Sequence, residues 1–529
     1  MDCKWKKLPG YILILQVIFA AVHGNSKAQP NHALSVASMP PLLDLENKLI
    51  DNLEDYANEL EQKLQTLQGY VPVMRSENEK GKLNAISYLS NPLNSFSLIR
   101  RLQQDWLKWQ SYMVQPVGTV QMRNFDGWWK DLPKKADLGD ACAAIVRIQI
   151  IYDLKVEDII RGKLDGRQYN VSLSTADIFA IGQHLAKGKA QAEAILWLQE
   201  VQNRLQEDLF AVPDHLTIKE IEVLKLLAEC HAHKKNYSKA LSLLEKCLML
   251  NPHDAELLRL CDETKELVEI HQNITLEKPK KPEDPLGVAF TLACRGVAKV
   301  SGRLHCFYNC NTTSFLRLAP LKVEEVGLDP YVLLHHEVIT PKESKELKEL
   351  ALSNLRASGV FRVEGAAFKR MRTVKSRWIH KDFNKMTKGI TRRIRDITGL
   401  DLTTSEKFQI INYGMGGHYN MHKDYFNYTN VDNTKISMAE QLGDRIATVL
   451  FYLSDVEQGG ATVFPKSGYT IYPRAGTAIF WYNLHTDGLG DPSTLHAACP
   501  VIVGSKWVMT EWIRELSQLF VRPCFKPST

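Results

Sequence analysis

A histidine and an aspartate separated by one residue occur three times in the chain, as His380-Lys-Asp382, His422-Lys-Asp424 and His485-Thr-Asp487. Alternate residues of an extended segment point to the same side, so one such pair can share a metal ion. The spacing alone does not choose among the three copies. Their surroundings do, and they favour the middle copy, leaving His380 and His485 as ordinary surface or loop residues.

The middle pair has the surroundings of an iron site. It follows a glycine-rich turn, Asn412-Tyr-Gly-Met-Gly-Gly-His-Tyr419, and precedes short strands, His496 and then Lys506. Two imidazoles and one carboxylate leave three positions open on an octahedral ion, which suits Fe(II) that binds a bidentate co-substrate and dioxygen. Lys506 sits in an apolar run, where an unpaired ammonium is costly. We therefore predict that Lys506 binds the far carboxylate of a dicarboxylic co-substrate.

The elements that position these residues read as β-strands. Short β-like runs separated by Gly, Pro, Asn and Asp follow residue 335, as expected for an all-β sandwich or jelly roll. We predict strands at 408–413, 446–453, 461–464, 469–472 and 477–482. Helices are expected at about 342–356 and 384–398, flanking that sheet.

The middle of the chain repeats a helical pattern. Gly182, Ala194 and Leu198 are matched by Ala228, Ala240 and Leu244, with the same steps of 12 and 4 residues. Small residues at a helix crossing are typical of tetratricopeptide-type helix pairs, which form a concave surface for extended peptides. A generic helical bundle remains the alternative. The charged, proline-rich stretch 277–285 predicts a linker.

The N-terminal part contains two further signals. Lysines precede an apolar run of about 12 residues that ends near Gly24, which is typical of a secretory signal peptide and too short for a membrane span. An apolar stripe then predicts a helix that is either a self-association seam or packed on its own domain. The stripe consists of Leu45, Leu49, Leu53, Tyr56, Leu60, Leu64 and Leu67.

Composition and cysteines limit the remaining possibilities. The 529 residues suggest two to four domains, and 44% hydrophobic with 24% charged residues excludes a disordered chain. A net charge of +6 is too dilute to indicate nucleic acid binding. Five Asn-x-Ser/Thr motifs agree with a glycosylating compartment, at Asn170, Asn236, Asn273, Asn311 and Asn427. In that compartment we expect disulfides Cys294–Cys306 and Cys499–Cys524, although sequence does not determine connectivity.

Two longer motifs connect these features to a family. They are Arg445-Ile-Ala-Thr-Val-Leu-Phe-Tyr-Leu-Ser-Asp and Gly459-Gly-Ala-Thr-Val-Phe-Pro, between the His422 pair and His496. With them, the C-terminal third resembles the Fe(II)/2-oxoglutarate dioxygenases. Nearly the whole mature chain resembles the α subunits of collagen prolyl 4-hydroxylases.

The resemblance implies a multidomain α + β protein. Its parts are a signal peptide (1–24), a helical N-terminal assembly region (25–140), a tetratricopeptide-like α domain that binds peptides (145–270), a linker and cysteine-containing segment (271–335), and a dioxygenase domain (336–529). The last is expected to be a double-stranded β-helix, or jelly roll.

The resemblance also implies residue roles. His422, Asp424 and His496 bind iron, and Lys506 pairs with the C5 carboxylate of 2-oxoglutarate, with Tyr413 and Thr462 as hydroxyl donors. Tyr419 and Arg445 are expected to be catalytic, beside the substrate. The reaction is oxidative decarboxylation of 2-oxoglutarate to succinate, coupled to hydroxylation of peptidyl proline at C4. L-ascorbate rescues oxidised iron.

The resemblance finally implies a partner and a compartment. The family's α subunits associate with protein disulfide isomerase as α2β2 tetramers in the lumen of the endoplasmic reticulum. The C-terminus, Phe-Lys-Pro-Ser-Thr, lacks a retention tetrapeptide. Such a partner therefore explains how the chain is retained.

The chain departs from the family pattern near the iron site and in the peptide-binding helices. Arg514 stands where relatives usually carry histidine, Leu495 where arginine is usual, and Met421 where proline is usual. Relatives line the peptide groove with tyrosines, whereas residues 171–270 contain only Tyr237. We predict weak binding of polyproline unless other rings substitute, namely Trp197, Phe179 or Phe210. The alternatives to collagen hydroxylation are the same chemistry on another peptide or residue, and a non-catalytic peptide-binding or assembly subunit.

Overall fold

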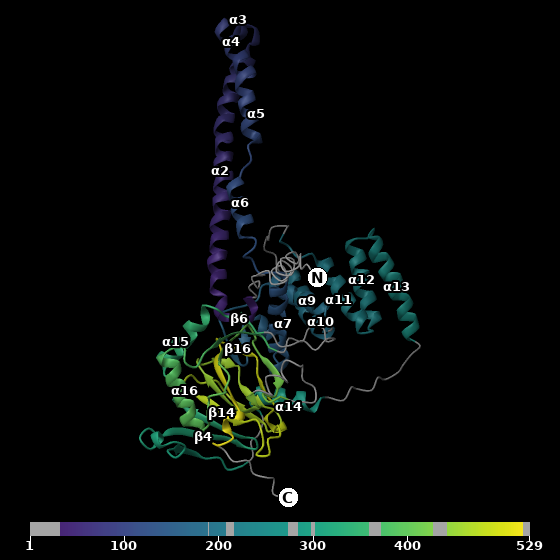
Figure 1. The fold of residues 1–529 in the computed structure, drawn as a ribbon. Coiled ribbons are helices and arrows are strands. Elements are labelled where there is room, and N and C mark those ends of the chain that lie inside the picture. The colour runs from purple at the N-terminus through teal and green to yellow at the C-terminus, as the bar shows by residue number, and fades with distance from the viewer. Residues whose placement is uncertain are drawn as a thin grey trace, which may run out of the picture. The chain divides into compact units, whose positions relative to one another are not determined.

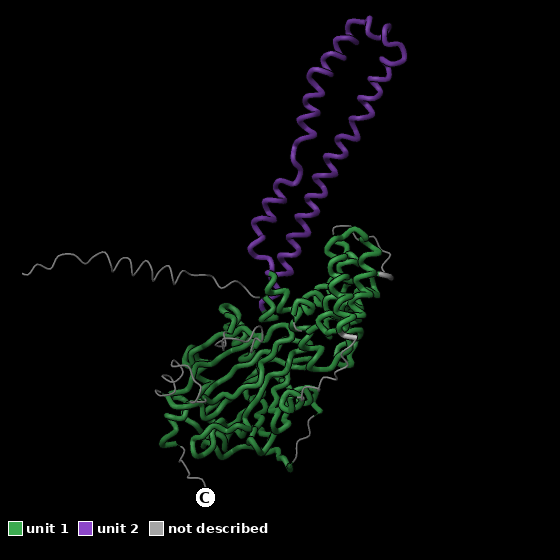
Figure 2. Tube along the Cα trace, turned by 90° about the vertical axis from the view of Figure 1, so that its right-hand side faces the viewer, with its two compact units in different colours: residues 1–37, 135–529 green, residues 38–134 purple. Residues whose placement is uncertain are grey.

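A computed structural model describes seven stretches of the chain, residues 32–188, 190–207, 216–272, 284–297, 302–358, 372–426 and 442–521. The chain forms two compact units, one of residues 38–134 and one of residues 1–37 with 135–529 (Figure 2). The expected signal peptide, Phe210, Cys524, Asn273 and Asn427 lie outside the described residues. Among the described helices, none is long and apolar enough to cross a membrane.

The smaller unit is a helical hairpin (Figure 1). Helix α2 forms one arm, and the chain returns alongside it through α3, α4, a π-helical turn, α5 and α6. Their bounds are Pro40–Leu83, Ala85–Ser90, Pro92–Arg100, Arg101–Asp105, Trp106–Val114 and Thr119–Trp128. The Lys63 ammonium crosses between the arms and donates hydrogen bonds to the carbonyls of Met113 and Gln115, at 3.0 and 2.6 Å.

The helix predicted from the apolar stripe is confirmed as part of α2. Leu45 and Leu49 are half-buried within the unit, whereas Leu53, Leu60 and Leu64 are exposed. The stripe thus divides between a packed part and a part that faces solvent. Both explanations of it, a packed helix and a self-association seam, stay predictions.

The larger unit begins with helices. They are α7 (Lys135–Tyr152), α8 (Val156–Ile160), α9 (Thr175–Ala186), α10 (Gln191–Glu207), α11 (Glu220–His233), α12 (Tyr237–Leu250) and α13 (Ala255–Gln272). The short strands β1 (Lys163–Leu164) and β2 (Arg167–Gln168) form a hairpin after α8. Two N-caps fix helix starts: Ser174 begins α9 with a capping box, and Asn236 begins α12.

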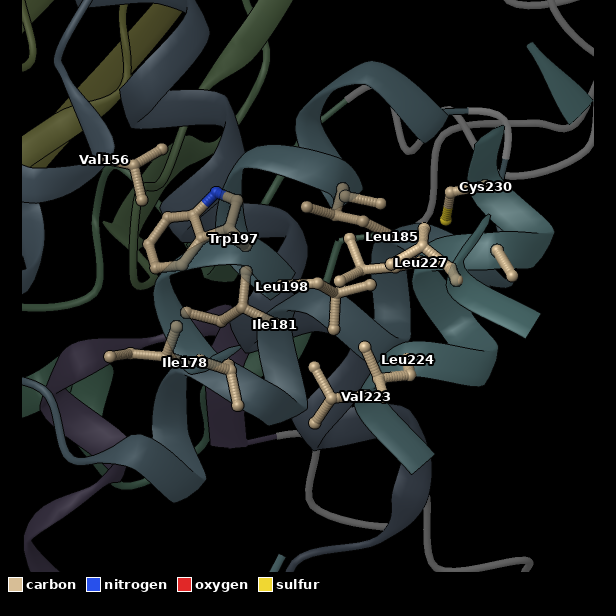
Figure 3. Packing of buried hydrophobic residues seen from close by; sticks show 14 of the residues in the cluster. Val156, Ile178, Ile181, Leu185, Trp197, Leu198, Val223, Leu224, Leu227 and Cys230 are labelled. Atoms are coloured by element: carbon tan, nitrogen blue, oxygen red, sulfur yellow. The ribbon is translucent and has the colours of Figure 1, made fainter. Parts of the chain in front are cut away.

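The repeated small residues lie where helices cross. A Cβ added to Gly182 on α9 would meet Leu198 Cδ2 of α10 at 2.7 Å, so only glycine fits there. Ala194, Leu198, Ala228, Ala240 and Leu244 are all buried. Figure 3 shows this core, in which Ile181, Leu185 and Leu227 surround Leu198. The predicted helices are confirmed, and their assignment to tetratricopeptide-type pairs stays a prediction.

The C-terminal part of the larger unit is built on a nine-stranded antiparallel sheet in the order β3-β4-β5-β14-β10-β17-β8-β7-β6. In that order the strands span Cys306–Asn309, Leu321–Leu328, Tyr331–His336, Ala478–Tyr482, Arg445–Tyr452, Trp507–Arg514, Phe408–Tyr413, Val374–Ile379 and Arg356–Ala357. The predicted strands near 408, 446 and 477 are confirmed. Residues 306–335, which we placed in the linker and cysteine-containing segment, instead contribute β3, β4 and nearly all of β5 to the sheet.

Two layers cover the two faces of this sheet. Helices α15 (Pro341–Leu352) and α16 (Lys385–Thr398) pack on one face through an apolar core, as predicted. A four-stranded sheet, in the order β13-β12-β15-β9, packs on the other face. Its strands span Tyr469–Ile471, Thr462–Phe464, His496–Ala498 and Tyr419–His422. A further pair, β11 (Gln458–Gly459) and β16 (Val501–Val503), lies beside it.

The disulfide pairing predicted from sequence was wrong. Cys294, which ends helix α14 (Pro285–Cys294), is bonded to Cys499, with a Cα–Cα distance of 5.6 Å. Helix α14 packs on the small sheet in a core that contains both cysteines, so it delivers Cys294 to Cys499. Cys306 is a free, exposed thiol on β3 at the edge of the large sheet.

Helix α7 joins the helical part to the sheets. The Arg147 guanidinium donates a hydrogen bond to the carbonyl of Gly416, and the Tyr152 hydroxyl donates one to the carbonyl of Pro500, both at 2.7 Å. Gly416 lies three residues before β9, and Pro500 two residues after β15. These two strands therefore have their ends fixed by one helix.

Candidate metal centre

The three predicted ligands meet between the two sheets. His422 ends β9 and His496 begins β15, and the two residues are register partners in the small sheet. Asp424 follows two residues after His422. Its Oδ1 lies 3.7 Å from His422 Nε2, and its Oδ2 lies 3.8 Å from His496 Nε2. One ligand atom from each residue lies within 4.8 Å of the others, close enough to share one ion.

The other two His-x-Asp pairs form no such group in the described part of the chain. His380 is exposed. His485 is also exposed, and its ring lies 3.7 Å from Asp491 without a third ligand. Among the described residues, geometry brings a third potential ligand only to the middle pair.

Hydrogen bonds at the far side of each imidazole orient the ligands. His422 Nδ1 lies 2.7 Å from the Asn420 carbonyl, and His496 Nδ1 lies 2.9 Å from the Thr494 carbonyl. A carbonyl accepts only, so each Nδ1 carries the proton and each Nε2 presents a lone pair. Both lone pairs point toward the Asp424 carboxylate.

A chain of polar side chains orients Asp424. The Thr448 hydroxyl donates to Asp424 Oδ2 at 2.8 Å, and the Asn483 amide donates to that hydroxyl at 2.9 Å. The Trp481 indole in turn donates to the Asn483 oxygen at 2.7 Å. Thr448 and Asn483 are fully buried, so the carboxylate is held rigidly.

The electrostatics favour a neutral His422 imidazole beside an ionised Asp424 carboxylate. Burial, with His496 as a neighbour, lowers the pKa of His422 to about 3. Burial alone would raise the pKa of Asp424, but His496, His422 and Arg445 outweigh it and hold that pKa below its ordinary value. This is the protonation state that a metal requires. The donor set therefore fits Fe(II).

A cavity opens beside these ligands. Of the predicted site residues, Tyr413, Tyr419 and Thr462 line it together with the ligands. The Tyr419 ring stacks on the His422 ring with centroids 3.5 Å apart. Arg445 and Lys506 are not among the residues that line the cavity.

Sequence reasoning missed several lining residues, chiefly Arg372, Gln409, Trp481, Thr510 and Trp512. Thr510 and Trp512 alternate along β17, so the period of two could have identified them. Arg372 had no such signal. Its guanidinium lies 5.3 Å from the Tyr419 ring centroid, and its buried Nε has no hydrogen-bond partner within the described residues.

Lys506 is buried just before β17, with 1% of its surface exposed. Its ammonium donates to the Gly460 carbonyl at 2.6 Å and lies 4.8 Å from the Tyr413 ring centroid. Burial lowers its pKa to about 7. The nearby Tyr452 hydroxyl, which sequence reasoning missed, donates to Thr462 Oγ1 at 2.7 Å. This end of the site thus gathers one cation and hydroxyl groups, a suitable set for an anion.

Comparison with known proteins places the chain in a family. The family model described as "Prolyl 4-Hydroxylase alpha-subunit, N-terminal region" matches residues 35–166, and "2OG-Fe(II) oxygenase superfamily" matches residues 408–514. Prolyl 4-hydroxylase subunit alpha-1 of Caenorhabditis elegans is 32% identical and covers 93% of this chain and 90% of its own. The human subunit alpha-1 is 30% identical over 97% of this chain and 98% of its own.

The chain belongs to the prolyl 4-hydroxylase α-subunit family. The predicted family is thereby confirmed, and the match runs over nearly the full length of the relatives. Among solved structures, a viral collagen prolyl hydroxylase from Paramecium bursaria Chlorella virus-1 aligns with a TM-score of 0.28 and 24% identity. The alignment covers 35% of this chain and 95% of the viral one.

Proposed function

We propose that this chain is the catalytic α subunit of a prolyl 4-hydroxylase. It couples oxidative decarboxylation of 2-oxoglutarate to hydroxylation of peptidyl proline at C4, as a procollagen-proline 4-dioxygenase. The observation that carries the proposal is the group of His422, Asp424 and His496 beside a cavity that Tyr413 also lines, with the buried Lys506 next to that tyrosine ring. The family to which the chain belongs supports the substrate.

In this proposal the site residues have separate roles. His422, Asp424 and His496 hold iron, which supplies the activation of dioxygen. Lys506 pairs with the C5 carboxylate of 2-oxoglutarate, while the hydroxyls of Tyr413 and Thr462 donate to it. Tyr419, which stacks on His422, and Arg445, which lies over the Trp512 ring, are the residues proposed to contact the peptide.

The family further supports finer features of the assembly. We take the sheet-rich region to be a double-stranded β-helix and the helices α9–α13 to be a tetratricopeptide-like peptide-binding domain. Protein disulfide isomerase is the proposed β subunit, L-ascorbate the proposed reductant, and the endoplasmic reticulum lumen the compartment. The exposed Asn170, Asn236 and Asn311 are the described residues available for glycosylation there.

One observation favours a second candidate, the same chemistry on a peptide other than procollagen. Trp197, one of the three rings named as replacements for the missing tyrosines, is fully buried and donates its indole N–H to Gln149 at 2.8 Å. The helices α9 and α11 carry no tyrosine. A groove without aromatic rings binds polyproline II poorly.

Co-expression with protein disulfide isomerase, followed by turnover assays, tests the proposal. Succinate release and hydroxyproline are measured with proline-rich and with other peptides, with and without Fe(II). Hydroxyproline that depends on iron, 2-oxoglutarate and His422 is the expected result. Succinate formation without hydroxyproline in any peptide contradicts the prolyl substrate, and no succinate formation contradicts the enzymatic function.

A further inference from the structure

Arg514 is the one arginine with no exposed surface among the described residues, and it ends β17 directly opposite Arg445 on β10. Its NH1 donates a hydrogen bond to the Gly443 carbonyl at 2.7 Å, and its NH2 lies 2.8 Å from Glu406 Oε1. The Gly443 carbonyl is its one hydrogen-bond acceptor among the described residues, whereas NH2 meets Glu406 as a close ion pair and, like the buried Nε, has no hydrogen-bond partner there.

Glu406 is shared between two arginines. Arg445 binds it with two hydrogen bonds, Nε to Oε1 at 2.7 Å and NH2 to Oε2 at 2.9 Å. Arg514 approaches the same Oε1 from the neighbouring strand. The carboxylate therefore cannot rotate without breaking contacts to both guanidinium groups.

The pair of arginines contacts the segment that follows the ligand Asp424. Arg445 NH1 donates to the Asp424 carbonyl at 3.3 Å. Both guanidinium groups lie over the Phe426 ring, 5.3 Å from its centroid for Arg445 and 5.0 Å for Arg514. Arg445 also lies 4.0 Å from the centroid of Trp512, which lines the cavity.

The position of Arg514 rules out a direct role at the co-substrate carboxylate. Lys506 precedes β17 and Arg514 ends it, so seven strand steps separate Arg514 from Trp507, roughly 24 Å along an extended strand. The residue that replaces the family's histidine thus acts at the opposite end of the strand from Lys506.

We infer that Arg514 is a positioning residue of the iron site, which fixes Arg445, Phe426 and thereby the backbone of Asp424 through the shared Glu406. The inference rests on the proposed function, since it concerns the same metal site. Arg514 thus controls the geometry of the Asp424 carboxylate ligand and makes no direct contact with 2-oxoglutarate.

The test uses Co(II) alone, added to the metal-free α subunit co-purified with its partner, without 2-oxoglutarate or peptide. Arg514→Met is expected to raise the Co(II) dissociation constant by about tenfold, since removing a residue that supports a metal ligand typically weakens metal binding by about 10–100-fold. The visible absorption spectrum of bound Co(II) should change as well. Arg514→Lys keeps the charge but cannot bridge two acceptors in the same way, so we expect an intermediate dissociation constant. The KM for 2-oxoglutarate should stay within about twofold of the native value, since Lys506 is untouched.

Arg393→Met is the matched control. Arg393 also binds one carboxylate, Glu343 at 3.0 and 3.1 Å, and one backbone carbonyl, Val338 at 2.7 Å, in the same domain. Its loss should lower the thermal midpoint without changing the Co(II) spectrum or affinity.

The outcomes separate the inference from the proposed function. Co(II) affinity and spectrum that are unchanged in Arg514→Met, or equally changed in Arg393→Met, overturn the inference. If Arg514→Met does not fold, a native affinity and spectrum in Arg514→Lys overturn it as well. A native protein that binds no Co(II) contradicts the iron site itself.

Discussion

At the scale of single residues, the proposed iron ligands differ from the other two His-x-Asp pairs by what surrounds them. His422 and His496 are each oriented by a backbone carbonyl, and Asp424 by Thr448, whereas His380 and His485 are exposed. A ligand set that is oriented in advance loses little entropy when the metal binds.

We expect His422→Ala, Asp424→Ala and His496→Ala each to reduce 2-oxoglutarate turnover by more than about 100-fold, because removing even an outer partner of a metal ligand costs 10–100-fold. The purified complexes should keep their thermal midpoint within a few degrees. His380→Ala and His485→Ala serve as controls and should turn over normally. Near-native turnover in any of the first three variants would contradict the assignment of that ligand.

Lys506 leads to a pH dependence of co-substrate binding. Its pKa lies near 7 in the free protein because of burial, so the ammonium is lost as the pH rises through 7. A carboxylate that binds the ammonium raises this pKa in the complex, so binding takes up a proton. The dissociation constant of 2-oxoglutarate should therefore increase above pH 7, by up to about tenfold per pH unit. Calorimetry of the Mn(II)-loaded protein in buffers of different ionisation enthalpy measures the proton uptake.

Two variants at this position check the explanation. Lys506→Arg keeps its charge at every accessible pH, so the pH dependence should disappear. Lys506→Ala should weaken the binding of 2-oxoglutarate at all pH values, since a buried carboxylate that is left without its cation costs several kcal/mol. A native pH dependence in Lys506→Arg would show that another group titrates.

At the scale of elements, the disulfide is a link between helix α14 and the strand that carries His496. Cys499 lies three residues after His496, and Cys294 ends the helix. The bond joins two residues that are 205 positions apart in the sequence. Such cross-links typically increase the free energy of unfolding by about 2–4 kcal/mol. Mass spectrometry of a non-reduced digest should recover the Cys294–Cys499 peptide pair.

The double variant Cys294→Ser/Cys499→Ser should lower the free energy of unfolding by that amount. Cys306→Ser and Cys310→Ser are the controls, since both thiols are free, and should leave it unchanged. Recovery of Cys294 joined to Cys306 would contradict the pairing.

The crossing of α9 and α10 provides a second test at this scale. A methyl group at Gly182 would meet the buried Leu198 side chain at 2.7 Å. Overpacking costs about 1–3 kcal/mol and exceeds the gain of up to about 1 kcal/mol in helix propensity, so Gly182→Ala should destabilise the protein. Gly389→Ala on α16, where a Cβ meets nothing within 4 Å, should be stabilising. Chemical denaturation of both variants measures the contrast, and equal effects would contradict the close crossing.

At the scale of the whole molecule, we propose that substrate choice depends on helices α9 and α11, which carry no tyrosine. Each aromatic ring that packs on a ligand stabilises the complex by about 0.5–1.5 kcal/mol, so a groove without several of them binds more weakly by orders of magnitude. We expect the full chain, complexed with its partner, to bind a proline nonamer weakly or not at all in calorimetry. A micromolar dissociation constant would contradict this description of the groove.

The experiment requires the full chain because the predicted boundary at 145 falls inside α7. That helix spans Lys135–Tyr152, and its Cys142 belongs to the core of the helical part. A fragment that starts at 145 would lack half of the helix, together with part of that core.

Helices and strands could be predicted from the sequence where their residue pattern is contiguous along the chain. Strand β8 was predicted at its true bounds because its apolar run and its flanking turns are contiguous. Helices α15 and α16 were predicted within a few residues for the same reason. Strands β3, at the edge of the sheet, and β4, beside it, were missed because most of their positions are exposed or half-buried, which weakens the apolar pattern.

Features that depend on packing between distant segments could not be predicted from the sequence. The disulfide depends on how α14 lies against β12, and no spacing between cysteines records that contact. The chain of Trp481, Asn483 and Thr448 behind Asp424 crosses two strands, and each residue alone is an ordinary polar or aromatic strand residue. Sequence alone suggests that Arg514 lies near the co-substrate because its number follows Lys506 closely, although its strand carries it away.

The contacts of α7 also have a consequence for synthesis on the ribosome. Tyr152 and its partner Pro500 are 348 residues apart, so the helix leaves the ribosome long before the strands that cover it. At a translation rate of about 5–20 residues per second, the side of α7 that faces the sheets stays uncovered for roughly 17–70 s. The nascent chain therefore carries an uncovered apolar helix for most of its translation, and a chaperone that binds apolar segments should associate with it until β16 emerges.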